Sequence, residues 1–238
     1  MICFLEEMFR LLYPKRCPIC QVILTKRSEQ ICSVCRKKTV PLREPVCKKC
    51  GKPVMDAQQE LCPDCYGKIH FFTKGRAVFL YEKEIKQSVY RFKFQNKREY
   101  GEFYSSEMAR LFGKEILAWK PDALIPIPMY RRKQRRRGYN QAEVLARGLG
   151  EKLSIPVNTT YLKRIKKTIP QKELGKKERE INLKNAFKTS KNEVKLKKVL
   201  LIDDIYTTGV TMDEAAKALL CDGVKEVRFL VLCTGKTD

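Results

Sequence analysis

The chain has 238 residues, which is enough for one domain of ordinary size and a small second one. Fifty Lys and Arg residues against 27 Asp and Glu residues give a formal net charge of +23, and 43% of all residues are hydrophobic. This apolar content excludes a disordered chain, and the positive charge favours polyanions as partners: nucleic acid, phosphorylated metabolites or an anionic membrane face. A charge that serves solubility alone is the alternative.

Residues 1–14, MICFLEEMFRLLYP, predict a short amphipathic helix, because the apolar residues Leu5, Met8, Phe9 and Leu12 follow helical spacing. Two acids interrupt what would be the apolar stretch of a signal peptide. No apolar run reaches the roughly 18–20 residues that span a bilayer. We therefore expect a cytoplasmic protein, with a place at the inner face of the membrane as the alternative.

Residues 15–70 contain an internal repeat of cysteines. Each unit reads C-x2-C-x11-C-x2-C, and the second unit begins thirty residues after the first. Two C-x2-C pairs at this spacing are typical of closed four-cysteine zinc sites, which are structural. We predict a double zinc ribbon with two zinc ions, and disulfides or a redox pair remain alternatives. The spacing leaves open whether each zinc takes four consecutive cysteines. The predicted ligands are Cys17, Cys20, Cys32, Cys35, Cys47, Cys50, Cys62 and Cys65.

The remaining cysteines and the single histidine receive no metal role. Cys3, Cys221 and Cys233 lack partners at metal spacing, so we interpret them as packing residues. His70 is interpreted as an ordinary linker residue.

Residues 71–238 predict an α/β domain. Strands are expected at 76–81, 122–128, 160–164, 198–202 and 226–234, and helices at 82–94, 100–119, 139–152 and 211–221. Because strands alternate with helices, we predict a mostly parallel, doubly wound sheet. In such sheets, ligands bind beyond the carboxyl ends of the strands.

The segment VLLIDDIYTTGVTMDE, residues 199–214, predicts a buried strand, a tight turn and a helix beginning near Thr211, with Glu214 as its capping-box partner. Free N–H groups at a helix start bind phosphate. The adjacent acids Asp203 and Asp204 suit a ribose diol and Mg²⁺, so they are also the candidate catalytic residues that position the sugar. The predicted phosphoribose-binding residues are Asp203, Asp204, Tyr206, Thr207, Thr208, Gly209 and Thr211.

A basic loop is predicted at residues 131–137, RRKQRRR, of which six are cationic. It follows a strand and therefore lies at the ligand edge, where it can bind pyrophosphate or a nucleic-acid backbone. The arginines selected are Arg131, Arg132, Arg135, Arg136 and Arg137. Tyr130 and Tyr139 on either side are candidates for stacking on bases, with half-buried packing as the alternative.

The long polar segment 168–187 has the profile of a lid that closes over a substrate, with an ordinary surface loop as the alternative.

The run from Asp203 to Thr211 resembles the signature of type I phosphoribosyltransferases. The whole chain is similar to the ComF/GntX group of competence-associated proteins, which pair a double zinc ribbon with a domain of that kind. The resemblance implies phosphoribosyl pyrophosphate with Mg²⁺ as a ligand, single-stranded DNA binding and a role in DNA uptake during natural transformation. The other matching residues are Phe92, Lys93 and Phe94, Pro126–Pro128, Arg137–Gln141, Phe187, and Thr168, Gln171, Arg179 and Asn182 in the mobile loop; Lys93 joins the pyrophosphate or DNA contacts.

Three hypotheses follow from these features. The first is an active phosphoribosyltransferase that releases pyrophosphate, although no acceptor pocket is evident in the sequence. The second is a DNA-binding accessory protein that retains the pocket as a ligand sensor. The third is an adaptor for a DNA-uptake helicase or membrane channel. The acceptor, the oligomeric state and any DNA sequence preference stay open.

Overall fold

The computed structural model describes residues 14–26, 28–166, 185–190 and 196–236. The predicted N-terminal helix, Cys3, and the loop residues Thr168, Gln171, Arg179 and Asn182 lie outside these ranges. The centre of the molecule is a four-stranded parallel sheet in the order β1-β6-β5-β2. Its strands are β1 (Lys74–Leu80), β6 (Glu226–Thr234), β5 (Lys198–Tyr206) and β2 (Ala123–Pro126).

The apolar run of β5 explains why the sheet is covered on both faces. Val199 and Leu201 belong to the core on one face, and Leu200 and Ile202 belong to the core on the other. All four side chains are almost fully buried, as expected for a central parallel strand. The predicted α/β fold with a mostly parallel sheet is confirmed. A separate antiparallel pair consists of β3 (Leu162–Arg164) and β4 (Phe187–Thr189).

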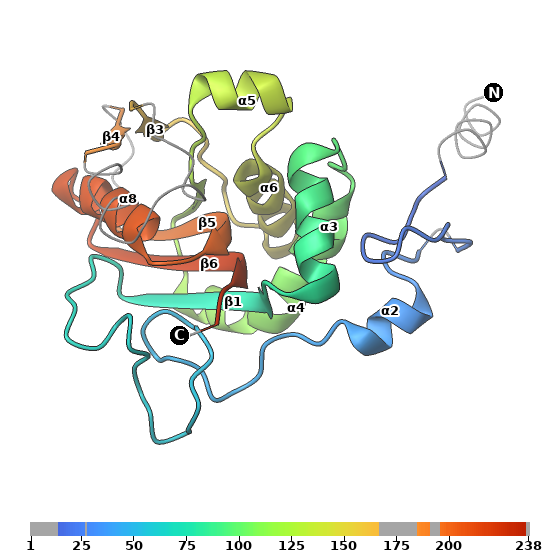
Figure 1. Cartoon of the computed structure of the whole chain (residues 1–238). Coiled ribbons are helices and arrows are strands. Elements are labelled where there is room, and N and C mark those ends of the chain that lie inside the picture. Colours follow the sequence, from blue (N-terminus) through green and yellow to red (C-terminus); the bar gives the residue numbers. More distant parts are fainter. Residues whose placement is uncertain (1–13, 27, 167–184, 191–195, 237–238) are drawn as a thin grey trace.

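Helices lie on both faces of the sheet (Figure 1). The helices α3 (Lys83–Phe94), α4 (Tyr100–Trp119) and α6 (Gln141–Leu153) pack on one face, and α8 (Val210–Cys221) packs on the other. Asn140 starts α6, because its side-chain oxygen accepts from the Ala142 N–H while its amide donates to the Ile127 carbonyl at 3.0 Å. This bond joins the start of α6 to the end of β2.

Residues 131–137 differ from the prediction, because they form a helix, α5 (Arg131–Arg137), and not a loop. Arg, Lys and Gln are all good helix formers, so the local propensity outweighs the repulsion between like charges. Gly138 ends the helix with a φ of 87°, in the left-handed region that glycine adopts without strain.

Strand β5 is longer than predicted. It continues through Tyr206, because Asp203 pairs with Val231 and Ile205 pairs with Cys233 of β6. The two acids therefore lie within the strand and not in the turn after it. Being held in the sheet fixes the backbone from which both carboxylates project.

Candidate functional site

The site is built around the acid pair, Asp203 and Asp204, near the carboxyl end of β5. The Asp204 N–H donates to Asp203 Oδ1 at 2.8 Å. The Lys93 ammonium, from the last turn of α3, lies 2.8 Å from Asp204 Oδ1, and each of these two side chains is only 15% exposed. Lys93, predicted to contact pyrophosphate or DNA, is thus already paired with a carboxylate of the site.

The electrostatic environment of the acid pair is unusual for carboxylates. Burial, followed by repulsion from Asp204, raises the pKa of Asp203 to about 7, although Lys93 and Arg164 act in the opposite direction. Asp203 therefore holds its proton to a higher pH than an ordinary aspartate. A bound cation would favour its ionised form.

Four cations form what we call the cation shell of this site: Lys93, Lys133, Arg137 and Arg164. Arg164 interacts electrostatically with Asp203, and Arg137 interacts with Asp204. Burial, followed by Arg137, Lys93 and Arg164, lowers the pKa of Lys133. Four positive charges against two carboxylates leave a formal excess of +2, which favours an anionic ligand.

Sequence reasoning missed two members of the cation shell. Lys133 stood within the basic run but was not selected, because nothing in the sequence says which face of α5 meets the acids. Arg164 ends β3, a short strand outside the main sheet. Its position directly before the long polar segment was the one available signal.

The predicted phosphate loop lies at residues 207–209, directly before α8. Gly209 has a φ of 86°, and a Cβ atom on it would lie 2.6 Å from the Tyr206 hydroxyl, so only glycine fits. Thr207 is exposed and Thr208 is half-buried. The loop therefore reaches the surface at its two threonines, directly before the start of α8.

The capping-box prediction for α8 is wrong. The helix begins at Val210 after Gly209, with no side-chain cap, and Thr211 lies inside its first turn. Glu214 Oε2 instead accepts from the N–H of Asn185, next to β4, at 2.7 Å.

The side chain of Tyr206 is buried in the core beneath the loop, with its hydroxyl next to Gly209. Its ring stacks on Phe229, with centroids 4.9 Å apart, and meets the edge of Phe72. Lys52 Nζ lies 5.9 Å from the centroid of the same ring. Only the backbone of Tyr206 is therefore available to a ligand at the loop.

The arginines of α5 divide into two groups. Arg131, Arg132, Arg135 and Arg136 are exposed, whereas Arg137 is half-buried and belongs to the cation shell. Lys133 of α5 is exposed and also belongs to the cation shell, so the solvent-facing basic surface continues into the charges around the acid pair.

Of the two tyrosines beside the basic run, Tyr139 cannot stack on bases. It is 6% exposed, and its hydroxyl donates to the Phe92 carbonyl. Tyr130 is half-buried, which fits the packing alternative.

The cysteine repeat forms two clusters, and each uses four consecutive cysteines. Within each cluster the four sulfur atoms lie within 4.8 Å of one another. The Cys20–Cys32 and Cys50–Cys62 sulfur distances are 3.7 and 3.6 Å. Four ligands at a Zn–S distance of about 2.3 Å in a tetrahedron would be about 3.8 Å apart, so both clusters fit structural zinc. The question of interleaved ligands is settled in favour of consecutive ones.

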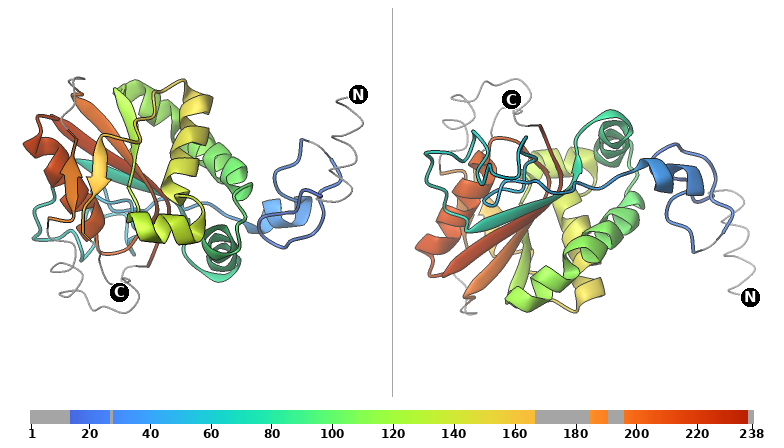
Figure 2. Two further views of the ribbon diagram at one scale, coloured as in Figure 1. Left: turned by 90° about the horizontal axis from the view of Figure 1, so that it is seen from above. Right: turned by 90° about the horizontal axis from the view of Figure 1, so that it is seen from below.

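The first ribbon, residues 15–40, docks on α3 and α4 (Figure 2). The Arg91 guanidinium donates to the Ile19 carbonyl at 2.6 Å. Arg36 Nη1 lies 2.5 Å from Glu107 Oε1, and Lys15 Nζ lies 3.0 Å from Glu102 Oε2. These polar contacts surround an apolar one, because Cys17, Ile19, Leu24, Ile31 and Cys35 of this ribbon belong to the core on the α3 and α4 face of the sheet. The short helix α2 (Ser33–Lys38) belongs to this ribbon.

The second ribbon, residues 45–66, docks on the edge strand β1. The Gly75 N–H donates to the Lys49 carbonyl at 2.7 Å, and a Cβ atom on Gly51 would lie 2.9 Å from the Arg76 Cα. All four cysteines of this ribbon are buried, and they belong to the same core as Tyr206 and α8. The second ribbon is therefore part of the face beneath the phosphate loop.

His70 lies outside both cysteine clusters, in agreement with its predicted linker role. Its Nδ1 lies 2.7 Å from Asp213 Oδ2, and the other oxygen of Asp213 accepts from the Phe71 N–H at 2.9 Å. The linker is thereby joined to the first turn of α8. Cys233 is buried, as predicted, whereas Cys221 is exposed at the end of α8, so its packing role is wrong.

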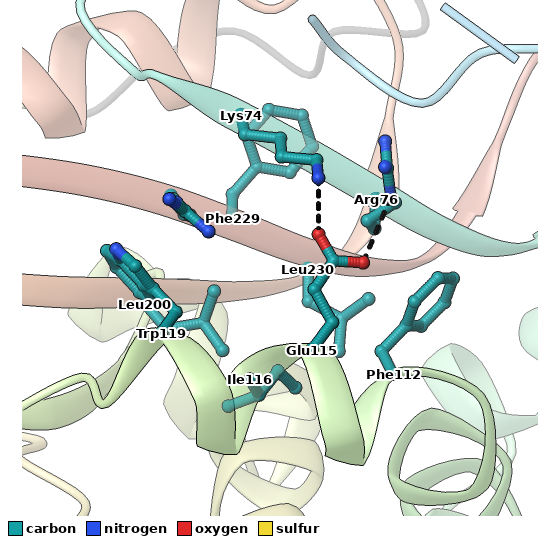
Figure 3. Close-up of a pocket in the computed structure, with 10 residues that line it drawn as sticks. Lys74, Arg76, Phe112, Glu115, Ile116, Trp119, Leu200, Phe229 and Leu230 are labelled. Carbon is teal, nitrogen blue, oxygen red and sulfur yellow. Dashed lines mark hydrogen bonds and ion pairs between the residues drawn. The ribbon is translucent and has the colours of Figure 1, made fainter. Parts of the chain in front are cut away.

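A pocket lies between α4 and the amino-terminal halves of β1 and β6 (Figure 3). Glu115 pairs with Lys74 at 2.7 Å and with Arg76 at 3.4 Å. Burial would raise the pKa of Glu115, but these two cations outweigh it and leave that pKa lowered. Three cations and one acid line this pocket, and no predicted site residue is among them; the pocket is at the opposite end of the strands from the acid pair.

Among the described residues, no helix combines the length and the apolar composition required to cross a bilayer.

Comparisons with known proteins agree with this architecture. Residues 8–66 match the double zinc ribbon domain, and residues 101–238, more than half of the chain, match the phosphoribosyl transferase domain. The chain is 41% identical over 149 residues to Competence protein F of Haemophilus influenzae, a match that covers 59% of this chain and 63% of that protein. The matched part thus spans less than two thirds of the Haemophilus protein.

Two further proteins are similar to this chain, one of them a relative in sequence and the other a solved structure. The chain is 30% identical over 160 residues to DNA utilization protein YhgH of Salmonella typhi, covering 64% of this chain and 68% of that one. Purine phosphoribosyltransferase from Pyrococcus horikoshii is 19% identical with a TM-score of 0.34, over 56% of this chain and 74% of that structure. The chain therefore belongs to the phosphoribosyl transferase domain family, among the relatives of Competence protein F that carry a double zinc ribbon.

Proposed function

We propose that this protein acts in DNA uptake or processing, binding phosphoribosyl pyrophosphate with Mg²⁺ at the acid pair and single-stranded DNA through α5. The observation that carries the proposal is the acid pair itself. Asp203 and Asp204 lie beside the first turn of α8 and within a shell of four cations. That combination suits a ligand with a diol, a phosphate and a pyrophosphate.

Each residue has a separate task in this proposal. Asp203 and Asp204 accept hydrogen bonds from the ribose hydroxyls and offer oxygen ligands to Mg²⁺. The N–H groups at the start of α8 and the hydroxyls of Thr207 and Thr208 bind the 5′-phosphate. Lys133 and Arg137 of the cation shell face the pyrophosphate, where their charge stabilises the leaving group if transfer occurs.

The DNA part of the proposal rests on α5 and on the relatives. Four arginines of α5 are exposed, and the segment 131–137 contains no acid. Competence protein F and DNA utilization protein YhgH carry names that refer to competence and DNA use. A polyanion with regularly spaced phosphates is the ligand that such a helix suits.

Active transfer of the phosphoribosyl group is the second candidate. The cation shell favours it, because stabilisation of a departing pyrophosphate is the main chemical requirement of that reaction. Release of pyrophosphate should then be detected with phosphoribosyl pyrophosphate, Mg²⁺ and an acceptor, either a free base or single-stranded DNA.

Calorimetric titration with phosphoribosyl pyrophosphate tests the ligand site. The wild type should bind it only with Mg²⁺, and the Asp203→Asn/Asp204→Asn double variant should lose at least about a hundredfold in affinity, since two charged hydrogen-bonding groups are removed. Glu143→Gln, at a half-buried acid on α6 that pairs with Arg147, is the control. Equal affinity of the double variant and the wild type would overturn the phosphoribose site. Binding without turnover would leave the accessory role and remove the enzyme.

The salt dependence of DNA binding tests the role of α5. Removing one residue that binds a phosphate should reduce the slope of log affinity against log salt by about 0.7 for a single strand. The Arg131→Ala/Arg135→Ala variant should therefore show a slope smaller by about 1.4. Lys197→Ala/Lys225→Ala removes two exposed lysines at the amino-terminal edge of the sheet and should leave the slope unchanged. An unchanged slope in the arginine variant would exclude α5 as the DNA-binding element.

A further inference from the structure

Two aromatic side chains on α3 are exposed beside the basic helix. Tyr90 and Phe94 are 48% and 50% exposed, and they are four residues apart, so they share one face of the helix. Their ring centroids are 4.9 Å apart. Together they form a small continuous aromatic surface, which we call the α3 aromatic face.

The inward side of α3 shows that packing does not require this arrangement. Val89 and Phe92 are fully buried on that side and supply the contacts with the core. Large apolar side chains that remain exposed and adjacent to one another are typical of a binding surface. The packing of α3 on the core therefore does not depend on the α3 aromatic face.

The charge around the α3 aromatic face indicates what it binds. The Arg137 guanidinium lies 4.7 Å from the centroid of the Phe94 ring, so the aromatic surface is continuous with α5. Figures 1 and 2 show α3 and α5 next to each other in both directions of view. Rows of cations beside exposed rings are how proteins hold single-stranded nucleic acid, with the phosphates on the cations and the bases on the rings.

We propose that the α3 aromatic face is a stacking surface for unpaired bases, and that Tyr90 and Phe94 make this protein prefer single strands over duplexes. In a duplex, the faces of the bases are covered by their neighbours, so rings on a flat surface gain nothing from it. The arginines of α5 bind phosphates of either form. The proposal deepens the proposed function, because it rests on single-stranded DNA as the ligand and assigns the residues that distinguish it.

The position of Lys93 joins this surface to the phosphoribose site. Lys93 pairs with Asp204, and its neighbour Phe94 stacks under Arg137 of α5. A strand whose bases stack on the α3 aromatic face would therefore pass directly beside the acid pair. The two ligands would then occupy adjacent parts of one surface.

Fluorescence anisotropy with a labelled oligothymidylate of about 20 nucleotides tests the proposal. The Tyr90→Leu/Phe94→Leu variant keeps apolar side chains on a half-exposed face, so the fold is retained. Its affinity for the single strand should fall by at least about fivefold, while its salt dependence stays that of the wild type. Its affinity for a duplex of the same length should not change. Phe71→Leu is the matched control, because Phe71 is 42% exposed and lies under Lys217, far from α5.

A reporter variant gives a direct readout. Tyr90→Trp places an indole on the surface, whereas the native Trp119 is 7% exposed and provides a constant background. Its emission should be quenched when the oligonucleotide binds.

Three outcomes would overturn the proposal. One is unchanged single-strand affinity in the leucine variant, which leaves the α5 result and the phosphoribose site standing. Another is a selective loss of binding to anionic phospholipid vesicles, which would make the surface a membrane contact. The third is a wild type that binds no single strand, which would remove the DNA part of the proposed function as well.

Discussion

The two zinc ribbons share one cysteine spacing, yet they are attached to the domain in different ways. The first packs Cys17, Ile19 and Cys35 into the core on the α3 and α4 face, adds ion pairs and carbonyl contacts, and leaves its Cys20 exposed. The second forms hydrogen bonds with β1, buries all four cysteines and belongs to the core that includes Tyr206. The same metal-binding motif thus has a partly exposed metal site in one case and a fully buried one in the other.

The cysteine spacing and the residues around the cysteines determine different properties of a zinc site. The spacing of ligands determines a tetrahedral site, because that depends on a few residues close in sequence. The residues around the ligands determine what the site supports. Loss of one zinc should therefore destabilise the protein less in the first ribbon, whose ligands are partly exposed, than in the second, whose ligands are all buried.

The largest difference in stability is expected when one equivalent cysteine is replaced in each ribbon. Cys50→Ser should lower the free energy of unfolding by more than about 4 kcal/mol, because it removes a ligand whose metal site is part of the core. Cys20→Ser should cost less than about 2 kcal/mol, since Cys20 is exposed whereas Cys50 is buried. Thermal unfolding followed by circular dichroism checks both, with zinc analysis showing one ion fewer in each. Equal losses would mean that the exposure of the ligand does not determine the cost of losing a zinc ion.

The raised pKa of Asp203 should make the free energy of unfolding depend on pH, and this dependence should not change when the first ribbon loses its zinc. Its pKa of about 7 exceeds the unfolded value of about 3.9, so the folded state retains the proton between those values and ionisation destabilises it as pH rises. Asp203→Asn should therefore unfold like the wild type near pH 4, and be more stable by up to about 4 kcal/mol above pH 7.

The same pair of unfolding curves, measured in the Cys20→Ser background, should show an unchanged pH profile. A profile that moves would show that the metal site of the first ribbon influences the acid pair. No gain of stability for Asp203→Asn at pH 8 would show that the acid is ionised at little cost in the folded protein.

Two acids of α4 that meet the first ribbon should differ in importance. Glu107 is 5% exposed on its side chain and pairs with Arg36 and Arg110, whereas Glu102 is 52% exposed. Glu107→Ala should cost about 1–2 kcal/mol, a range kept low by the half-exposed arginines, and Glu102→Ala less than about 0.5 kcal/mol. Limited proteolysis of the first ribbon, with unfolding curves, measures both. The reverse order would mean that exposed contacts hold this ribbon in place.

The smallest effect is expected at Tyr206, where the second ribbon meets the loop. Within the described part of the chain, its buried hydroxyl has no hydrogen-bond partner, while its ring packs on Phe229 and Phe72. Tyr206→Phe should therefore change the free energy of unfolding by less than about 0.5 kcal/mol, or raise it slightly. Chemical denaturation measures this, with zinc content as the control. A loss above about 1 kcal/mol would show that the hydroxyl, and not the ring, joins the ribbon to the loop.

Most of the fold was predictable because its signals are local. The helix at 100–119 and the strand at 226–234 were predicted with the bounds that the structure gives them. Both have continuous periodicity that a single segment reveals. Strand β5 was predicted four residues too short, since paired acids suggest a loop until the pairing with β6 is known.

The surroundings of the site were less predictable because they depend on tertiary packing. Arg164 interacts with Asp203 from a strand outside the main sheet. The ring of Tyr206 is buried because it packs on Phe229 and Phe72. The sequence placed stacking aromatics beside the basic run at Tyr139, which is buried. The exposed pair on α3 is distant in sequence, and only the packing of α3 against α5 reveals it.

The order of strands in the sheet has a consequence for how the protein is made. Strands β6 and β5 occupy the centre of the sheet but come last in the chain, and Lys74 of β1 pairs with Arg228 of β6. Contacts of such long sequence separation form slowly, because a long loop must close first. All eight zinc ligands precede β1 in the chain, so both ribbons can bind metal on the ribosome before the first strand of the sheet is synthesised. A chain halted after β5 would carry metal and helices, yet it would lack the one strand that joins β1 to the rest.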